Sequence, residues 1–163
     1  MIPIFLNQSV GNQICIDWDL YFSDFLKLAI PSTRILVHEI RQKVGCEVKV
    51  WYQESSNGNV HLGLRFDRDI SVLDAFMIRA YVADDPKRLR LDMARYMRTG
   101  SLYEMNRCFQ AKIELREGQA SLLSAGPWIR LEEPDIPDIS SVNPRALICR
   151  LQEERGKAAK VII

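Results

Sequence analysis

Apolar and polar residues alternate along several short segments of the chain, which is the pattern of half-buried β-strands. The segments with this pattern are 13–20, 46–52, 60–66, 107–115 and, as a candidate fifth, 122–131. Turn-forming residues at 55–59 join the second and third segments, so these two should form a hairpin. The pattern therefore predicts a sheet of four strands, with the fifth segment as a further candidate.

Helical spacing of apolar residues predicts helices between the strands. The first helix should cover 32–44, with Ser32 as its N-cap and Gly45 as a left-handed stop. Ser71 and Asp74 form a capping box that should begin the second helix.

Asp85 and Pro86 predict the start of a third helix, which should continue to Gly100. An alternative for part of this segment is a short strand at 88–92, because Leu89 and Leu91 alternate there with charged residues. We favour the helix.

Prolines and acidic residues dominate 132–143, which predicts an extended linker. The linker separates a core of residues 1–131 from a C-terminal segment, 144–163, which should be helical to about residue 154. The core order β-α-β-β-α-β predicts an α+β, RRM-like sheet with helices packed mainly on one face, followed by the C-terminal helix. Such a sheet leaves its other face free for a functional site.

Composition fits one globular domain, since the chain has 163 residues of which 47% are apolar and 26% charged. No apolar run is long enough to predict a membrane span, and the first residues lack the basic flank of a signal peptide. The four cysteines are far apart and form no Cys-x-x-Cys pair. They predict a reduced, intracellular, cytoplasmic protein in which cysteines act as small core residues.

The formal net charge is only +1, which argues against a uniformly basic nucleic-acid binder. Basic residues nevertheless gather in a stripe between Arg79 and Arg98. The other members of this stripe are Lys87, Arg88, Arg90 and Arg95. The stripe predicts either a solvated helix face or a contact to nucleic-acid phosphates.

Two carboxylates follow the apolar centre of the first strand. Asp17 and Asp19 are two residues apart, so on a strand both side chains point to the same face. Paired carboxylates are ligands that Mg²⁺ or Mn²⁺ prefers, and such ions align triphosphates for in-line displacement. The alternative is a strand that leaves the core and whose acids are simply solvated.

His61 enters the third strand directly after the turn at 55–59. The turn should expose backbone N–H groups that could receive a phosphate, and His61 could donate a hydrogen bond to the same group. The alternative is a structural histidine, which is the usual role of a lone histidine in a strand.

The segment from Ile14 to Asp19, three hydrophobic residues followed by Asp-x-Asp, resembles the first motif of the archaeo-eukaryotic primase superfamily. The family's second motif, Ser-Gly-x-Gly-x-His or the looser Ser-x-His, resembles Ser56 to His61. Asn57 and Asn59 stand in place of the two glycines, and asparagine is the residue that best tolerates the left-handed backbone after glycine. The resemblance covers about residues 13–115 and marks a minimal or divergent member, because family members usually have an additional N-terminal module.

The family's third motif, a hydrophobic residue followed by an acid, has two candidates. Leu91 and Asp92 match it in order and distance, and Glu114 in the fourth predicted strand is the alternative. Lys112 shares the strand face of Glu114 and is similar to the basic residue that such enzymes direct at the triphosphate.

The resemblance implies a metal-dependent nucleotidyltransferase that synthesises primers from NTPs or dNTPs on a single-stranded DNA template. Asp17, Asp19 and Asp92 would hold Mg²⁺ or Mn²⁺, and a larger replication subunit or a helicase would be a partner. The residues implied for the nucleoside triphosphate are Ser56, Asn59, His61 and Lys112. Those implied for template phosphates are Lys87, Arg88, Arg90 and Arg95.

Two other function classes are consistent with the sequence. Glu47 and Lys49, with an upstream acid, have the spacing of a metal-dependent nuclease, although Glu-x-Lys is common on amphipathic strands. A non-catalytic module could stack single-stranded bases on Trp18, Trp51 and Tyr52. An accessory replication subunit could instead dock on a partner through the C-terminal helix and its apolar end.

Overall fold

The computed structural model describes residues 8–102, 105, 108, 110–132 and 143–161. Its elements, in chain order, are β1 (Gln13–Trp18), α1 (Phe22–Asp24), η1 (Phe25–Ala29), α2 (Ile30–Val44), β2 (Val48–Glu54), β3 (Val60–Phe66), α3 (Val72–Tyr81), α4 (Pro86–Thr99), β4 (Ala111–Arg116), β5 (Gln119–Ser124), β6 (Ile129–Arg130) and α5 (Pro144–Val161). The segment η1 is a π-helical stretch that continues directly into α2.

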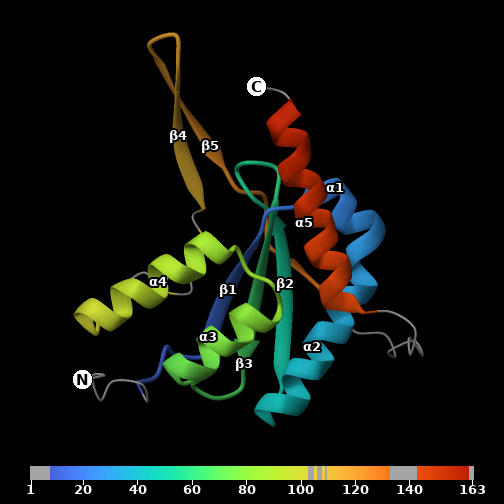
Figure 1. Cartoon of the computed structure of the whole chain (residues 1–163), viewed down its shortest axis with the longest axis vertical. Coiled ribbons are helices and arrows are strands. Elements are labelled where there is room, and N and C mark those ends of the chain that lie inside the picture. Colours follow the sequence, from blue (N-terminus) through green and yellow to red (C-terminus); the bar gives the residue numbers. More distant parts are fainter. Residues whose placement is uncertain (1–7, 103–104, 106–107, 109, 133–142, 162–163) are drawn as a thin grey trace.

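The main sheet is antiparallel, with strand order β1-β3-β2-β6, and β4 pairs only with β5 (Figure 1). The predicted α+β class is therefore confirmed. The prediction that 107–115 and 122–131 would extend the main sheet is wrong, except for the two residues of β6 that pair with β2. The hairpin β4–β5 instead extends away from the sheet, as Figure 1 shows.

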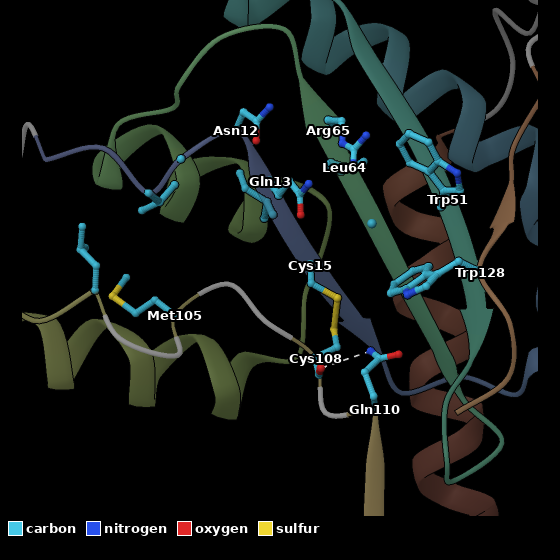
Figure 2. Close-up of a pocket in the computed structure, with 15 residues that line it drawn as sticks. Asn12, Gln13, Cys15, Trp51, Leu64, Arg65, Met105, Cys108, Gln110 and Trp128 are labelled. Atoms are coloured by element: carbon cyan, nitrogen blue, oxygen red, sulfur yellow. Dashed lines mark hydrogen bonds between the residues drawn. A yellow bond between two sulfur atoms is a disulfide. The ribbon is translucent and has the colours of Figure 1, made fainter. Parts of the chain in front are cut away.

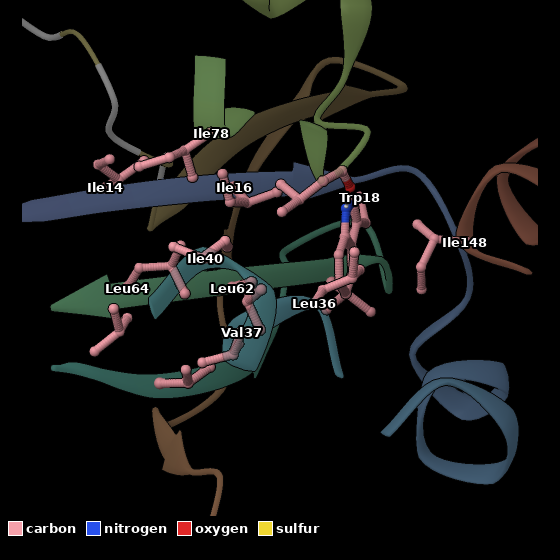
Figure 3. Packing of buried hydrophobic residues seen from close by; sticks show 14 of the residues in the cluster. Ile14, Ile16, Trp18, Leu36, Val37, Ile40, Leu62, Leu64, Ile78 and Ile148 are labelled. Atoms are coloured by element: carbon pink, nitrogen blue, oxygen red, sulfur yellow. Dashed lines mark hydrogen bonds between the residues drawn. The ribbon is translucent and has the colours of Figure 1, made fainter. Parts of the chain in front are cut away.

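One face of the main sheet forms the hydrophobic core. Ile14, Ile16 and Trp18 of β1 alternate toward this face and are buried against residues of the helices (Figure 3). The helical residues of this cluster are Phe25, Ala29, Leu36, Val37, Ile40, Ala75, Ile78, Ile148 and Leu151. Their presence on one face shows that α2, α3 and α5 cover the same side of the sheet. These helices leave the other side of the sheet, which we call the open face, for a functional site.

Capping signals located most helix boundaries correctly. Asp74 N–H donates to Ser71 Oγ at 3.1 Å, and Lys87 N–H donates to Asp85 Oδ1 at 2.9 Å, as expected for N-caps. Gly45 and Gly100 end α2 and α4 in the left-handed conformation. The alternative strand at 88–92 is wrong, because this segment lies within α4.

Ser32 is not the N-cap of α2. It lies inside the helix and is buried, because the chain is already helical from Phe22 onward through α1 and η1. Thr33, the next residue, donates its hydroxyl hydrogen to Ala29 O at 2.7 Å, a bond back along the helix. The apolar residues before Ser32 thus extend the helix toward the N-terminus, beyond the start that Ser32 indicated.

The C-terminal helix packs in the same core as the sheet. Ile148 and Leu151 are buried in the main cluster, and α5 lies beside α2 (Figure 1). Most of the predicted linker, residues 133–142, and the last two residues lie outside the described residues. No helix in the described part of the chain is long and apolar enough to cross a membrane.

Cys15 and Cys108 form a disulfide, with their Cα atoms 5.8 Å apart. The prediction that all four cysteines are reduced is therefore wrong for this pair, and only Cys46 and Cys149 are free thiols. The bond joins β1 to the segment after α4, although 93 residues separate the two cysteines. The spacing of the cysteines in the sequence does not indicate this pairing, because only the fold brings Cys15 and Cys108 together.

Thiol titration tests this disulfide. Denatured protein that has not been reduced should react at two thiols, Cys46 and Cys149, and at four after reduction. Four reactive thiols before reduction would show that the isolated protein is fully reduced.

Candidate functional site

Asp17 of β1 and His61 of β3 lie side by side on the open face. They are direct partners in the antiparallel register, and Asp17 Oδ1 is 3.9 Å from His61 Nε2. The His61 side chain is 6% exposed and that of Asp17 is 33% exposed, so the carboxylate is the part that solvent reaches. The pairing of β1 with β3 thus brings the acid at the end of the first strand beside the histidine of the hairpin.

Gln53 of β2 determines which nitrogen of His61 has the proton. Gln53 Nε2 donates to Gly126 O at 2.8 Å, and this bond orients the amide so that Gln53 Oε1 faces His61 Nδ1 at 3.0 Å. Gln110 Nε2 also donates to the same Oε1 at 2.9 Å. Since Gln53 Oε1 can only accept, the neutral imidazole must have its hydrogen on Nδ1. Its Nε2 lone pair then faces Asp17.

The pair Asp17–His61 therefore consists of two hydrogen-bond acceptors that face each other. Burial, and then the charge of Arg88, lower the pKa of His61 to about 4, so that the ring is neutral at pH 7. Burial raises the pKa of Asp17 to about 6, with further raising by Asp84, Asp85 and Asp19 and opposition from Arg88. A carboxylate beside an imidazole lone pair favours a proton or a cation between them.

Asp17 is held by the segment that precedes α4. Asp17 N–H donates to Asp84 Oδ1 at 2.8 Å, and Asp85 N–H donates to Asp17 O at 2.9 Å. Arg88 donates to Cys15 O at 2.7 Å. These groups occupy the free backbone edge of β1, where a further strand would otherwise pair. They fix the strand end that presents Asp17.

Asp92 lies behind this segment in a buried ion-pair network. Its Oδ2 accepts from Arg79 Nη1 at 2.7 Å, while Arg79 Nε donates to Asp84 Oδ2 at 2.6 Å. Arg88 Nη1 also donates to both Asp84 oxygens at 2.8 Å. The structure therefore places Asp92 with Arg79, and it directs Arg88 inward to Asp84.

Asp19 lies just past the end of β1 and is exposed. Asn59 Nδ2 donates to Asp19 Oδ1 at 2.8 Å, and Arg155 Nε donates to Asn59 Oδ1 at 3.2 Å. Asp19 N–H donates to Gln152 Oε1 at 3.1 Å. Helix α5 thus orients Asp19, a role that helical spacing alone could not indicate for Gln152 and Arg155.

The turn between β2 and β3 uses its own backbone N–H groups. Asn57 and Asn59 N–H both donate to Ser55 Oγ, and Gly58 N–H donates to Ser55 O. These three groups are therefore not available to a phosphate in this conformation, contrary to the prediction of an open turn. Ser56 is half-buried in the same turn, beside Ser55.

Lys112 of β4 reaches back to this turn, where its Nζ donates to Asn57 Oδ1. Glu114, two residues along the same strand, forms an ion pair with Arg116 at 3.0 Å. The alternative third acid thus lies on the β4–β5 hairpin and is neutralised there. Lys112 is the hairpin residue that the structure brings to the turn.

The remaining basic candidates are on the surface of α4. Lys87, Arg90 and Arg95 are exposed, whereas Arg88 is half-buried. The first three are therefore accessible to solvent and to a charged ligand.

The residues of the alternative functions are dispersed. Glu47 is exposed beside Arg41, and Lys49 lies four residues from Gln53 on β2, which is roughly 13 Å along a strand. Trp18 and Tyr52 are directed to the core, where Trp18 Nε1 donates to Val82 O at 2.8 Å. Only Trp51, of the three proposed stacking residues, is on the open face.

Among the described residues, no group of three or more His, Cys, Asp or Glu side chains is arranged as a metal site. The Asp17 carboxylate and His61 Nε2 nevertheless provide two donors that face one point. Carboxylates suit Mg²⁺ and Mn²⁺, and Mg²⁺ in polymerase-type sites is often bound by one or two carboxylates together with substrate phosphates.

Comparison with protein-family models, with curated proteins and with solved structures finds no match to this chain.

Proposed function

We propose that this chain is a metal-dependent nucleotidyltransferase of the primase type, in which Asp17 and His61 bind the metal complex of a nucleoside triphosphate. The observation that supports this most directly is the position of His61, whose Nδ1 lies 3.0 Å from Gln53 Oε1 while its Nε2 lies 3.9 Å from Asp17 Oδ1. Two unprotonated acceptors that face each other add nothing to stability, and we assign a bound cation to the place between them.

The order of the elements also supports this proposal. Strands β1, β3 and β2 are neighbours, and α2 joins the parallel strands β1 and β2 across the core face. We interpret this as an RRM-like core of the kind that the resemblance to primases implies. The fourth strand of the sheet, β6, pairs with β2. Among the residues that the structure describes, the edge of β1 has no strand beside it and is occupied by the polar segment before α4.

Each candidate residue has a defined part in the proposal. Asp17 and Asp19 hold the divalent ion, Mn²⁺ or Mg²⁺, and His61 Nε2 contributes a further donor. A bound ion would neutralise and align the triphosphate for in-line displacement of pyrophosphate. Arg79 neutralises Asp92, so we assign the ion to Asp17, Asp19 and His61 alone.

The nucleotide and template contacts come from the surrounding elements. Lys112 contacts Asn57 of the turn and Arg155 contacts Asn59, which donates to Asp19, so both cations would meet triphosphate oxygens bound there. Ser56 and Asn59 would line the same side. Lys87, Arg90 and Arg95 on α4 would contact phosphates of a single-stranded template, with a larger replication subunit or a helicase as partner.

Incorporation of labelled nucleotides on single-stranded DNA with Mn²⁺ tests the proposal. Wild type should incorporate nucleotides, and Asp17→Asn should lower the rate by on the order of 100-fold because it removes a charge at the reacting phosphate. Mn²⁺ binding in the presence of nucleotide, followed by electron paramagnetic resonance, should weaken in parallel.

Asp69→Asn is the matched control, because Asp69 is an exposed acid beyond the far end of β3. This variant should keep the wild-type rate. Absence of both Mn²⁺-dependent nucleotide binding and incorporation in wild type would remove the proposal. Equal rates in wild type and Asp17→Asn would remove the assignment of the site.

A further inference from the structure

The open face also contains a pocket of about 810 Å³, bordered by the Cys15–Cys108 disulfide (Figure 2). We propose that this pocket binds a base of single-stranded nucleic acid, with the attached phosphates directed to Arg65 and Arg130. The role of the bound strand as a template rests on the proposed function. Binding of the strand itself depends on neither a metal ion nor Asp17.

Trp128 forms one wall of the pocket and lies against the sheet at Gly63. A Cβ atom at Gly63 would be 3.3 Å from Trp128 Cζ3, so the absence of a side chain allows the indole to approach the strand. Trp128 remains 41% exposed in this position. A large aromatic surface that lies against a strand and is partly open to solvent is suited to stacking on a planar ligand.

Trp51 on β2 provides a second aromatic ring, and two guanidinium groups lie over it. The Cζ atoms of Arg65 and Arg130 are 5.2 Å and 5.6 Å from the ring centre. Such cation–π contacts hold both arginines beside the pocket. Guanidinium groups in this position can pair with the phosphates of a ligand whose base stacks on Trp128.

The rest of the lining has the polarity that a base requires. Asn12, Gln13 and Gln110 place amide groups around the pocket, and amides can both donate to and accept from base edges (Figure 2). Among the described residues that line the pocket there is no acid, whereas Arg65 adds a positive charge. An anionic ligand with an aromatic base is therefore complementary to this lining.

The pocket favours a base from single-stranded nucleic acid over one from a duplex. Stacking on tryptophan requires an unpaired base, because paired bases in a duplex are covered on both faces. The pocket volume is within the range of roughly 300–1,000 Å³ that small-molecule sites have, which is adequate for one nucleotide unit. Cys15, which lines the pocket, is two residues from Asp17 on β1, so roughly 7 Å of strand separates the pocket from the Asp17–His61 pair.

Fluorescence anisotropy with a labelled oligo-dT of about ten nucleotides, in EDTA, tests the inference. Wild type should bind the oligonucleotide, and Trp128→Leu should weaken binding by about 10-fold to 100-fold because a stacking surface is lost. Arg65→Ala should weaken binding and reduce the slope of log affinity against log salt by about 1. Circular dichroism establishes that each variant is folded, and Arg65→Ala alters an exposed side chain, so it is the safer variant.

Arg150→Ala, a change at an exposed arginine of α5, is the control and should bind like wild type. No binding by wild type, or equal binding by Trp128→Leu, Arg65→Ala and wild type, would overturn the inference. Binding of free dTMP without binding of the oligonucleotide would overturn the assignment to a strand. Oligonucleotide binding that is lost in Arg65→Ala, in a protein that incorporates no nucleotide, would support this pocket while removing the proposed catalysis.

Discussion

Replacing Asp84 with alanine should lower the free energy of unfolding by about 3–5 kcal/mol, the largest effect of a single substitution that we expect. Asp84 is buried, and its carboxylate accepts from both Arg79 and Arg88. Without it, the fully buried Arg79 guanidinium would keep Asp92 alone as its charged partner among the contacts described. The backbone N–H groups of Asp17 and Asp85 would also lose the oxygen to which they donate.

Urea unfolding followed by circular dichroism measures this effect. Asp69→Ala, at an exposed position, should change the free energy of unfolding by no more than about 0.5 kcal/mol. A loss below about 1 kcal/mol in Asp84→Ala would show that the network does not hold the edge of β1. Such a result would leave the position of Asp17 without the explanation given above.

The network also shows why the charged stripe was difficult to interpret from the sequence. Arg79, Arg88 and Asp92 have the spacing of a solvated helix face, and their charges suggest phosphate contacts or metal ligands. In the structure these residues are directed inward and compensate one another through Asp84. Periodicity identifies the helix but not which charges meet across two helices, because that depends on how α3 and α4 pack.

Local signals were sufficient for the central part of the fold. The alternation around Ile16 and the turn at 55–59 predicted β1 and the β2–β3 hairpin. These elements are determined by contacts close in sequence or by an apolar face that only one register can bury.

Long-range contacts could not be predicted in this way. Alternation in β4 predicts a strand, yet Ile113 and Leu115 are 72% and 75% exposed because β4 pairs with β5 outside the main sheet. The disulfide between Cys15 and Cys108, and the contact of Arg155 with Asn59, likewise depend on packing between distant segments. The pattern of one segment contains no information on such partners.

Stability should depend on pH in opposite directions through the two members of the Asp17–His61 pair. His61 has a pKa of about 4 in the folded protein and an ordinary value of 6.5, so between these values only the unfolded chain binds the proton. The contribution of His61 is therefore fully present above pH 6.5 and is lost as pH falls toward 4, by about 3 kcal/mol.

Asp17 has a pKa of about 6 in the folded protein and an ordinary value of 3.8, so between these values only the folded protein holds the proton. Its contribution is greatest below pH 3.8 and is lost as pH rises to 6. Because a third of the side chain is exposed, we expect about 1–2 kcal/mol rather than the full effect of the pKa change. In wild type the two contributions partly cancel between pH 4 and 6.

Two variants separate these contributions. The free energy of unfolding of each variant is compared with that of wild type at the same pH, so the titration of all other groups cancels. Asparagine resembles a protonated aspartate, so Asp17→Asn should match wild type near pH 4 and become more stable by about 1–2 kcal/mol above pH 6. His61→Gln should instead lose stability relative to wild type as pH rises from 4 to 6.5, because the benefit of the neutral imidazole is absent. Urea unfolding at intervals between pH 4 and 7, in EDTA, measures both differences. Differences that change in the same direction with pH would contradict the lowered pKa of His61 and the raised pKa of Asp17.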